Sequence, residues 1–104
     1  MANKNTMPGS LIESEKLLDD KLVKVVESLG GWCLKMGTTH ISGLPDRVCL
    51  LPRGRVLFAE IKTTKKKPRK IQIWVHNKLK GLGFEVYVID RTEQIKELTA
   101  IYGL

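Results

Sequence analysis

The stretch GLPDRVCLLPRGRVLFAEIK, residues 43–62, decides the fold of this chain. Residues 47–51 and 56–62 are mostly apolar runs, and the turn residues Pro-Arg-Gly-Arg at 52–55 separate them. Two such runs joined by a short turn predict a β-hairpin. Asp46 opens the first strand of this hairpin, and Glu60 and Lys62 lie at the end of the second.

Alternation along the second strand of the hairpin divides its side chains between two faces. One face is wholly apolar and consists of Leu57, Ala59 and Ile61. The other face consists of Val56, Phe58, Glu60 and Lys62. This strand therefore ends with an acid and a base on the same face. Because Asp46 opens the partner strand, it can lie near Glu60 across the sheet.

A helix is expected upstream of the hairpin. Ser10 is a candidate N-cap, Glu13 completes a capping box, and the pair Gly30-Gly31 ends the helix. Its apolar face consists of Leu11, Leu18, Leu22, Val25 and Leu29. Glu15 and Asp19 fall inside this apolar arc, which is unusual for acids. They either snorkel from the edge of the arc or have a function on that face.

Two more strands and two more helices complete the pattern. Residues 32–36 and 84–89 are expected to form strands. Pro68 suits the first turn of a helix that ends at residues 81–83. One side of that helix is lined by Ile71, Val75, Leu79 and Leu82. Thr92 is expected to cap a last helix, whose inward residues are Ile95, Leu98 and Ile101.

The element order is therefore helix, three strands, helix, strand, helix, which predicts an α/β fold. The third and fourth strands are connected through a helix, so if they pair they should be parallel with a right-handed crossover. Residues 1–9 show no periodicity and are expected to form a flexible N-terminal arm. Residues 10–104 are expected to form a single domain, since 104 residues leave little room for a second.

Composition excludes several classes of protein. Apolar residues make up 42% and charged residues 28% of the chain, which is typical of a globular domain. No apolar run is long enough to span a bilayer, and residues 1–10 lack the apolar middle of a secretory signal. Two cysteines, Cys33 and Cys49, are too few for a disulfide framework or a four-cysteine metal site. Both fall in strands, where buried free thiols are expected.

The net charge of +7 is concentrated in one segment. Residues 52–80 contain ten Lys and Arg and one acid, whereas the rest of the chain contains eight bases and ten acids. Such a segment is typical of a surface that binds a polyanion. By itself a basic run is equally compatible with a solvated, lysine-rich loop.

The end of the hairpin offers ligands for a metal ion. Two carboxylates, Asp46 and Glu60, and the main-chain carbonyl of Ile61 are hard oxygen ligands of the kind that suits Mg²⁺ or Mn²⁺. Lys62 lies where it could hold a water molecule or a phosphate. The alternative is a plain salt bridge between Glu60 and Lys62 at the end of a strand.

These residues resemble a known nuclease signature. Gly43-Leu44-Pro45-Asp46, thirteen residues, and then Glu60-Ile61-Lys62 resemble the PD-(D/E)xK motif, whose superfamily core has the same element order. Together with residues 68–72 and 83–90, the chain resembles the virus-type replication-repair nuclease (VRR-NUC) domain over about residues 11–98. The resemblance implies a restriction-endonuclease-like fold with a mixed sheet flanked by helices.

The resemblance also implies a role for individual residues. Asp46 and Glu60 match the metal-binding acids, the Ile61 carbonyl is a further ligand, Lys62 matches the catalytic lysine, and Gln72 matches a glutamine beside the active site. The acid of the first helix is usually Glu in this family, whereas Asp19 occupies the matching position and Glu15 lies one turn earlier. Basic residues beside this site are expected to contact DNA, and they are Lys65, Lys66, Lys67, Arg69 and Lys70.

Three further side chains are singled out, and for His40 and Trp74 two interpretations are open. His40 could contact a phosphate, and the alternative is a surface-loop histidine. His76 follows Gln72 by one helical turn and is expected on the helix surface. Trp74 could stack on a base, but packing of the helix would explain it equally well.

The resemblance implies a Mg²⁺-dependent DNA endonuclease, with Mn²⁺ as a substitute, in which metal-activated water hydrolyses the phosphodiester bond. Small stand-alone members are typical of phages, which implies action in the cytoplasm of a bacterial host and no membrane partner. A homodimer acting on branched DNA such as a Holliday junction is the expected form. The alternatives are a non-catalytic basic DNA-binding module and a structural or inhibitory protein that binds an acidic partner.

Overall fold

The computed structural model describes residues 14–37, 40–63 and 66–103. The elements in chain order are α2 (Glu15–Ser28), β1 (Trp32–Lys35), β2 (Arg47–Leu51), η1 (Pro52–Gly54), β3 (Arg55–Ile61), α3 (Lys70–Gly81), β4 (Glu85–Ile89) and α4 (Thr92–Tyr102). The expected arm at residues 1–9, the Ser10 cap with Glu13, and Leu11 lie outside the described residues. Within the described ranges, no helix is long and apolar enough to cross a membrane.

The four strands form one mixed sheet in the order β1-β2-β3-β4. β1 pairs with β2 and β2 with β3 in antiparallel fashion, which confirms the hairpin. β3 pairs with β4 in parallel, as the intervening helix α3 predicts. The sheet is therefore built as the sequence indicates, with β3 paired on both sides.

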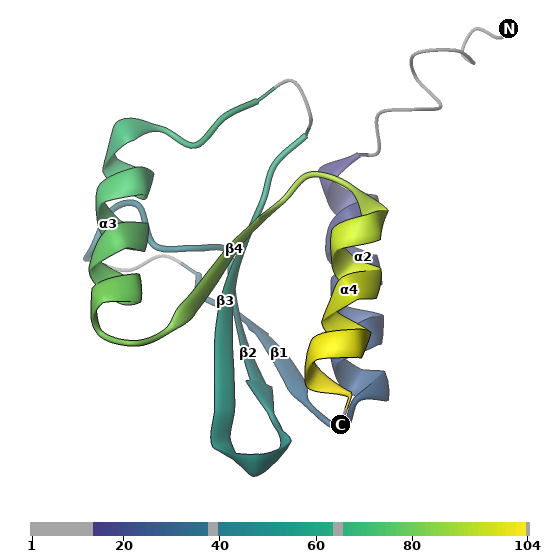
Figure 1. The fold of residues 1–104 in the computed structure, drawn as a ribbon. Coiled ribbons are helices and arrows are strands. Elements are labelled where there is room, and N and C mark those ends of the chain that lie inside the picture. Colours follow the sequence, from purple (N-terminus) through teal and green to yellow (C-terminus); the bar gives the residue numbers. More distant parts are fainter. Residues whose placement is uncertain (1–13, 38–39, 64–65, 104) are drawn as a thin grey trace, which may run out of the picture.

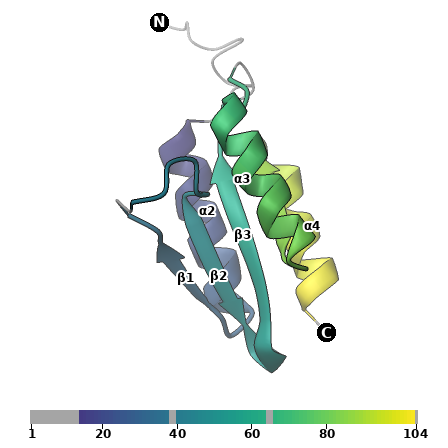
Figure 2. The ribbon, with the colours of Figure 1, turned by 90° about the vertical axis from the view of Figure 1, so that its left-hand side faces the viewer.

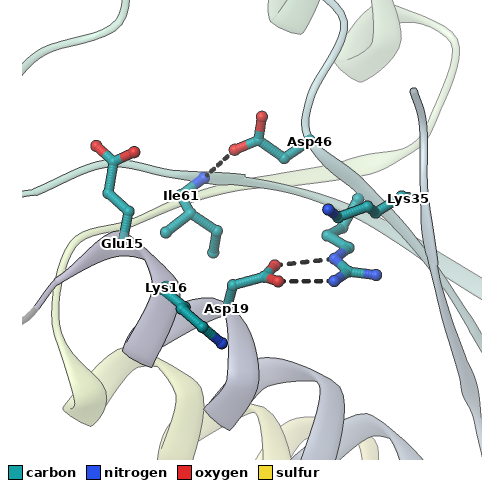
Figure 3. A pocket seen from close by; sticks show the side chains of 7 residues that line it. Glu15, Lys16, Asp19, Lys35, Asp46 and Ile61 are labelled. Carbon is teal, nitrogen blue, oxygen red and sulfur yellow. Dashed lines mark hydrogen bonds and ion pairs between the residues drawn. The ribbon is translucent and has the colours of Figure 1, made fainter. Parts of the chain in front are cut away.

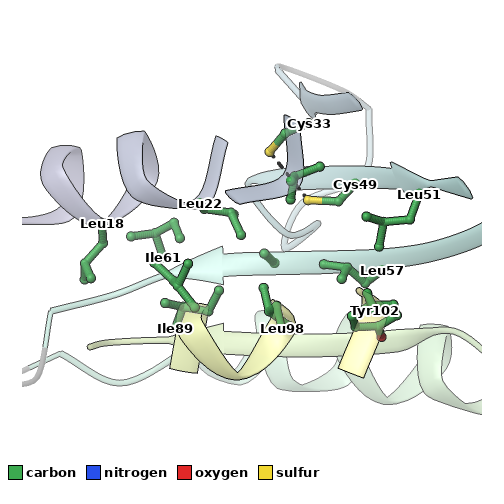
Figure 4. Close-up of a cluster of buried hydrophobic side chains, with 13 residues drawn as sticks. Leu18, Leu22, Cys33, Cys49, Leu51, Leu57, Ile61, Ile89, Leu98 and Tyr102 are labelled. Carbon is green, nitrogen blue, oxygen red and sulfur yellow. Dashed lines mark hydrogen bonds between the residues drawn. The ribbon is translucent and has the colours of Figure 1, made fainter. Parts of the chain in front are cut away.

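Helices cover both faces of the sheet. Figure 1 shows α2 and α4 together on one face and α3 on the other. Seen from the α3 side, α3 covers only part of the sheet, and β1 and β2 lie beside it (Figure 2). The face covered by α2 and α4 is the apolar one, and its core includes Leu18, Leu22, Leu57, Ile61, Ile89 and Leu98 (Figure 4).

Strand β3 separates the core from the functional residues. Leu57, Ala59 and Ile61 are buried against α2 and α4, as alternation predicts. Glu60 is also buried, at 2% exposure, but it belongs to the face toward α3. The strand thus has apolar contacts on one face that hold it in place, while its other face positions an acid.

The described helices begin at other residues than expected, although the expected Ser10 cap itself lies outside the described residues. The N-cap of α2 is Ser14, whose hydroxyl accepts a hydrogen bond from the Leu17 N–H at 3.0 Å. Pro68 lies before α3, which begins at Lys70, and the N-cap of α4 is Arg91, so that Thr92 is the first helical residue. Local cap chemistry placed these starts within a few residues, and the packing of each helix on the sheet decided the rest.

The expected inner face of α3 is confirmed for Val75 but wrong for Ile71 and Leu82. Its buried residues are Gln72, Val75 and His76, whereas Ile71 and Leu82 are 41% and 63% exposed. In α4, Tyr102 is buried in place of Ile101. In α2, Val26 is buried with Leu18 and Leu22, while Val25 and Leu29 pack at the edge of the core. The polar residues that α3 buries are explained by the site beneath it.

The two cysteines are buried free thiols, as expected. Cys33 and Cys49 face each other across β1 and β2, and their sulfur atoms lie 3.5 Å apart. They fill the space between these strands and α2 as part of the core.

Candidate active site

Asp46 lies at the open end of the β2–β3 hairpin, away from its turn at Pro52–Gly54. The register of β2 on β3 pairs Arg47 with Ala59, which places Asp46 opposite Glu60. One Asp46 carboxylate oxygen, Oδ2, accepts a hydrogen bond from the Ile61 N–H at 2.9 Å. The Asp46 carbonyl accepts another from the Met36 N–H at 2.9 Å. Main-chain contacts therefore fix this acid between the strand ends, although its side chain is exposed.

Glu60 is a buried carboxylate in which one oxygen has polar partners and the other has none among the described residues. Its Oε2 accepts a hydrogen bond from Gln72 Nε2 at 2.8 Å and lies 3.4 Å from Lys62 Nζ. Its Oε1 is buried and has no hydrogen-bond partner among the described residues. The Glu60–Lys62 salt bridge, which was the alternative interpretation, is therefore present, but it leaves Glu60 Oε1 without a partner among the described residues.

The electrostatic environment of Glu60 opposes its ionisation. Burial raises the pKa of Glu60 above its ordinary value, and the nearby Asp46 carboxylate raises it further. Lys62 and Gln72 act in the opposite direction and only partly compensate. Two acids in this position favour a positively charged group between them.

Gln72 connects α3 to the sheet. Its Oε1 accepts a hydrogen bond from the Arg69 N–H at 2.8 Å, which satisfies a donor at the start of the helix. Its amide nitrogen is thereby directed at Glu60. The two contacts require opposite ends of the amide, so they define its orientation.

A cleft of about 370 Å³ lies on the α2 side of the same strand ends. Its lining consists of Glu15, Lys16, Asp19, Lys35, Asp46, Arg47 and Ile61. Figure 3 shows Glu15 and Asp46 on either side of Ile61. Glu15 Oε2 accepts a hydrogen bond from the Thr63 N–H at 3.3 Å, so this acid reaches the segment directly after Lys62. The first-helix acids thus lie at the same end of the sheet as Asp46 and Glu60.

Asp19 forms an ion pair with Arg47, a residue that the sequence pattern did not single out. Its two oxygens accept hydrogen bonds from Arg47 Nε and Nη2 at 2.8 and 2.6 Å. These contacts lower the pKa of Asp19 and raise that of Arg47. The sequence does contain a signal for this pair. Arg47 shares the inward face of its strand with Cys49 and Leu51, and Asp19 is an acid on the apolar face of the helix. Each unusual charge is explained by the other.

The expectation is wrong for one of the two histidines, His76. His76 is 4% exposed, so its expected place on the helix surface is wrong. Its Nε2 is buried without a hydrogen-bond partner among the described residues, and burial lowers its pKa. His40 is exposed. The structure therefore buries the histidine that was expected outside, because α3 turns its polar side toward Asp46 and Lys62.

The expected DNA-contacting bases are accessible where they are described. Lys66, Lys67, Arg69 and Lys70 are exposed between β3 and the start of α3, and Lys65 lies outside the described residues. Lys66 Nζ is 3.8 Å from Glu15 Oε2, which ties this segment to the first helix. Lys66 therefore lies beside Glu15, whereas the ion pair of Glu60 is with Lys62.

The acids present fit a divalent cation. Among the described residues, no group of three or more Asp, Glu, His or Cys side chains is arranged to hold a metal. Two carboxylates with a main-chain oxygen and water are nevertheless a donor set that Mg²⁺ accepts. The open, buried Oε1 of Glu60 beside Asp46 is the observation that favours such an ion.

Comparison with known proteins agrees with this geometry. No family model matches the chain. The chain is 33% identical over 87 residues to "Putative nuclease p44" of Acyrthosiphon pisum secondary endosymbiont phage 1, covering 84% of this chain and 94% of that protein. A solved structure, "VRR_NUC domain", superposes with a TM-score of 0.78 at 30% identity, covering 85% of this chain and 96% of that one.

The fold and the relatives define a nuclease with a restriction-endonuclease-like fold, an enzyme that hydrolyses phosphodiester bonds. The chain belongs to the VRR-NUC family, in which it is a small phage-type member.

The Asp19–Arg47 pair predicts a pH-dependent contribution to stability. Because its folded pKa lies below the ordinary 3.8, the contribution is present above about pH 4 and disappears as the pH falls through the lowered value. We expect Asp19→Asn to lower the free energy of unfolding by about 1–3 kcal/mol at pH 7, and by progressively less below pH 4. Urea denaturation across this pH range measures the difference.

Asp20→Asn is the matched control. In the part of the chain that the structure describes, Asp20 pairs with Lys16 in an exposed i,i+4 contact, so its loss should change stability by less than about 0.5 kcal/mol. A difference between Asp19→Asn and the unmodified protein that stays constant from pH 7 to pH 3 would contradict the assignment.

Proposed function

We propose that this protein is a Mg²⁺-dependent DNA endonuclease, with Mn²⁺ as a substitute. The observation that supports it is the Glu60 carboxylate, held by Gln72 and Lys62 through one oxygen and open at the other. A carboxylate retained only for a salt bridge does not require burial at 2% exposure beside a second acid.

Asp46, Glu60 and the Ile61 carbonyl would hold the metal ion, and Glu15 would approach from the first helix. When bound, the ion supplies Lewis acidity at the phosphate and lowers the pKa of a bound water molecule. Asp46 is aimed by the Ile61 N–H, and Glu60 by Gln72, so neither acid needs to reorganise when a ligand arrives.

Lys62 and Gln72 would orient the reacting groups. The Lys62 ammonium is 18% exposed and can hold a phosphate oxygen or a water molecule while it stays close to Glu60. Gln72 keeps the Glu60 carboxylate in one rotamer through its contact with the start of α3. Lys66, Lys67, Arg69 and Lys70 would bind the phosphates on either side.

Removing the charge of Glu60 should abolish cleavage and spare DNA binding. We expect Glu60→Gln to reduce Mg²⁺-dependent cleavage of labelled DNA at least about 100-fold, because it removes a metal-binding carboxylate. EDTA should stop the unmodified protein equally. Gel shift in EDTA should give the same affinity for both proteins within about twofold, since the phosphate contacts are elsewhere.

Glu85→Gln is the control for this experiment. Glu85 is exposed at the opposite end of the sheet, so this variant should cleave DNA normally. DNA binding with no metal-dependent product from the unmodified protein would favour the non-catalytic DNA-binding module. Absence of both binding and cleavage would favour a protein that binds an acidic partner.

Between the two first-helix acids, Glu15 is the better metal ligand. Asp19 matches the family position, but both of its oxygens are engaged by Arg47. Among the described residues, Glu15 has a 3.3 Å contact with the Thr63 N–H and an ion pair of 3.8 Å with Lys66, and it reaches the segment that follows Glu60 and Lys62. Asp19 would then support the site through Arg47, which opens the strand directly after Asp46.

This assignment predicts a separation of activity from stability. Glu15→Gln should lower cleavage about 10-fold or more with little change in the free energy of unfolding, since Glu15 is half-exposed. Asp19→Asn should mainly lower stability and should cleave normally at temperatures where it is folded. Parallel cleavage assays and urea denaturation test this, and the reverse pattern would assign the metal to Asp19.

The substrate is proposed to be branched DNA, such as a Holliday junction, bound by a homodimer. Within the described residues, the bases available for DNA lie on a loop and a helix end, where they meet phosphates and not base edges. Such contacts read shape better than sequence. Two copies related by a twofold axis would place two sites on the two symmetry-related arms of a four-way junction.

A substrate panel and a mass measurement test this proposal. Labelled four-way junction, flap, duplex and single-stranded DNA are incubated with protein and Mg²⁺, and the junction should be cut fastest. Light scattering should give twice the 11.7 kDa of one chain. Equal rates on duplex and junction, or a monomeric mass at the assay concentration, would contradict selectivity or dimerisation respectively.

A further inference from the structure

Apart from Lys70 at its start, the outer face of α3 is not used by the proposed active site. Gln72, Val75 and His76 face the sheet, and successive helix positions turn by about 100°, so Trp74 points to the opposite side. Its side chain is accordingly 65% exposed, so packing within this chain does not explain it. An indole offers a large apolar area that a single chain leaves in water.

Two lysines flank this indole on the same line of the helix. Lys70 and Lys78 lie four residues before and after Trp74, so the three side chains form a stripe about 12 Å long. Lys70 and Lys78 are exposed, and α3 contains no acidic residue from Lys70 to Gly81. We call these three residues the outer stripe of α3.

The positive charge of the outer stripe favours a polyanion over a second copy of the chain as its ligand. In a twofold homodimer the same patch meets itself, so this face would bring lysines against lysines with no acid of α3 between them. A polyanion carries the complementary charge. An aromatic ring between two cations is the arrangement by which proteins bind single-stranded nucleic acid, with the ring on a base and the cations on phosphates.

We propose that the outer stripe is a second nucleic-acid contact that binds an unpaired DNA strand. The Trp74 indole stacks on one exposed base, and the Lys70 and Lys78 ammonium groups bind phosphates on either side of it. Duplex DNA offers no free base face at its side, so the stripe distinguishes an unpaired strand from a paired one. Lys70 also belongs to the basic segment that leads from Lys62, which connects the stripe to the site. The proposal rests on DNA as the substrate proposed above.

The chain provides a matched control for the test. It contains two tryptophans, and Trp32 on β1 is 64% exposed, almost the same as Trp74. Binding is measured in EDTA, so that no cleavage occurs, with an oligothymidine of about 12 nucleotides and with a duplex of the same length. In Trp32→Phe all tryptophan emission comes from Trp74, and in Trp74→Phe it comes from Trp32.

We expect oligothymidine to quench the emission of Trp32→Phe and to leave that of Trp74→Phe unchanged. Trp74→Ala should weaken oligothymidine binding about 5- to 100-fold, whereas Trp32→Ala should change it less than twofold. Duplex binding should change less than twofold in both. Lys78→Ala should lower the slope of log affinity against log salt for oligothymidine by about 0.7, the loss of one phosphate contact.

Unchanged Trp74 emission, or equal effects of Trp74→Ala and Trp32→Ala, would overturn the proposal. A loss of the dimer in Trp74→Ala with oligothymidine affinity retained would overturn it too, and would assign the stripe to a second copy of the chain. Circular dichroism establishes that each variant is folded. Because these measurements use no metal, they can succeed while Glu60→Gln fails to affect cleavage, or the reverse, so the two proposals fail separately.

Discussion

The buried Glu60 carboxylate is the constraint on which the rest of the site depends. An ionisable group at 2% exposure needs partners, and this one receives Gln72 from α3 and Lys62 from its own strand. The need of Glu60 for a hydrogen-bond donor explains why α3 buries Gln72, whereas its apolar pattern predicts that Ile71 and Leu82 are buried. It also explains why α3 begins where it does, because Gln72 must both bind the Arg69 N–H and reach the sheet. The other oxygen of this carboxylate, Oε1, is buried without a hydrogen-bond partner among the described residues.

The charges around the site are organised in two layers. Asp46 and Glu60 face each other at the strand ends, where burial and the Asp46 carboxylate raise the pKa of Glu60. Behind them, Asp19 and Arg47 neutralise one another and join α2 to the start of β2. Arg47 also donates to the Cys33 carbonyl at 3.3 Å, which links β1 to the same anchor. The Asp19–Arg47 pair therefore stabilises this end of the sheet without engaging Asp46 or Glu60.

Much of the fold could be predicted from short-range patterns. Alternation in residues 56–62 identified the buried face of β3, and the spacing of Asp46 and Glu60 across a hairpin placed two acids together. The helix faces were predicted less well. Apolar periodicity assigned Ile71 and Leu82 to the inner side of α3 and missed Gln72 and His76, because a periodicity rule assumes that a helix packs on an apolar surface. The surface beneath α3 includes a carboxylate, so polar residues turn inward.

The sequence by itself determined which residues are available for chemistry, the order of the elements and the pairing of the central hairpin, since these depend on neighbours along the chain. Tertiary structure alone decided which acid of the first helix is engaged. Glu15 and Asp19 are one helical turn apart on the same face, and nothing local distinguishes them. Arg47 approaches Asp19, twenty-eight residues away in the chain, only because α2 packs on this face of the sheet. That contact leaves Glu15 facing the strand ends.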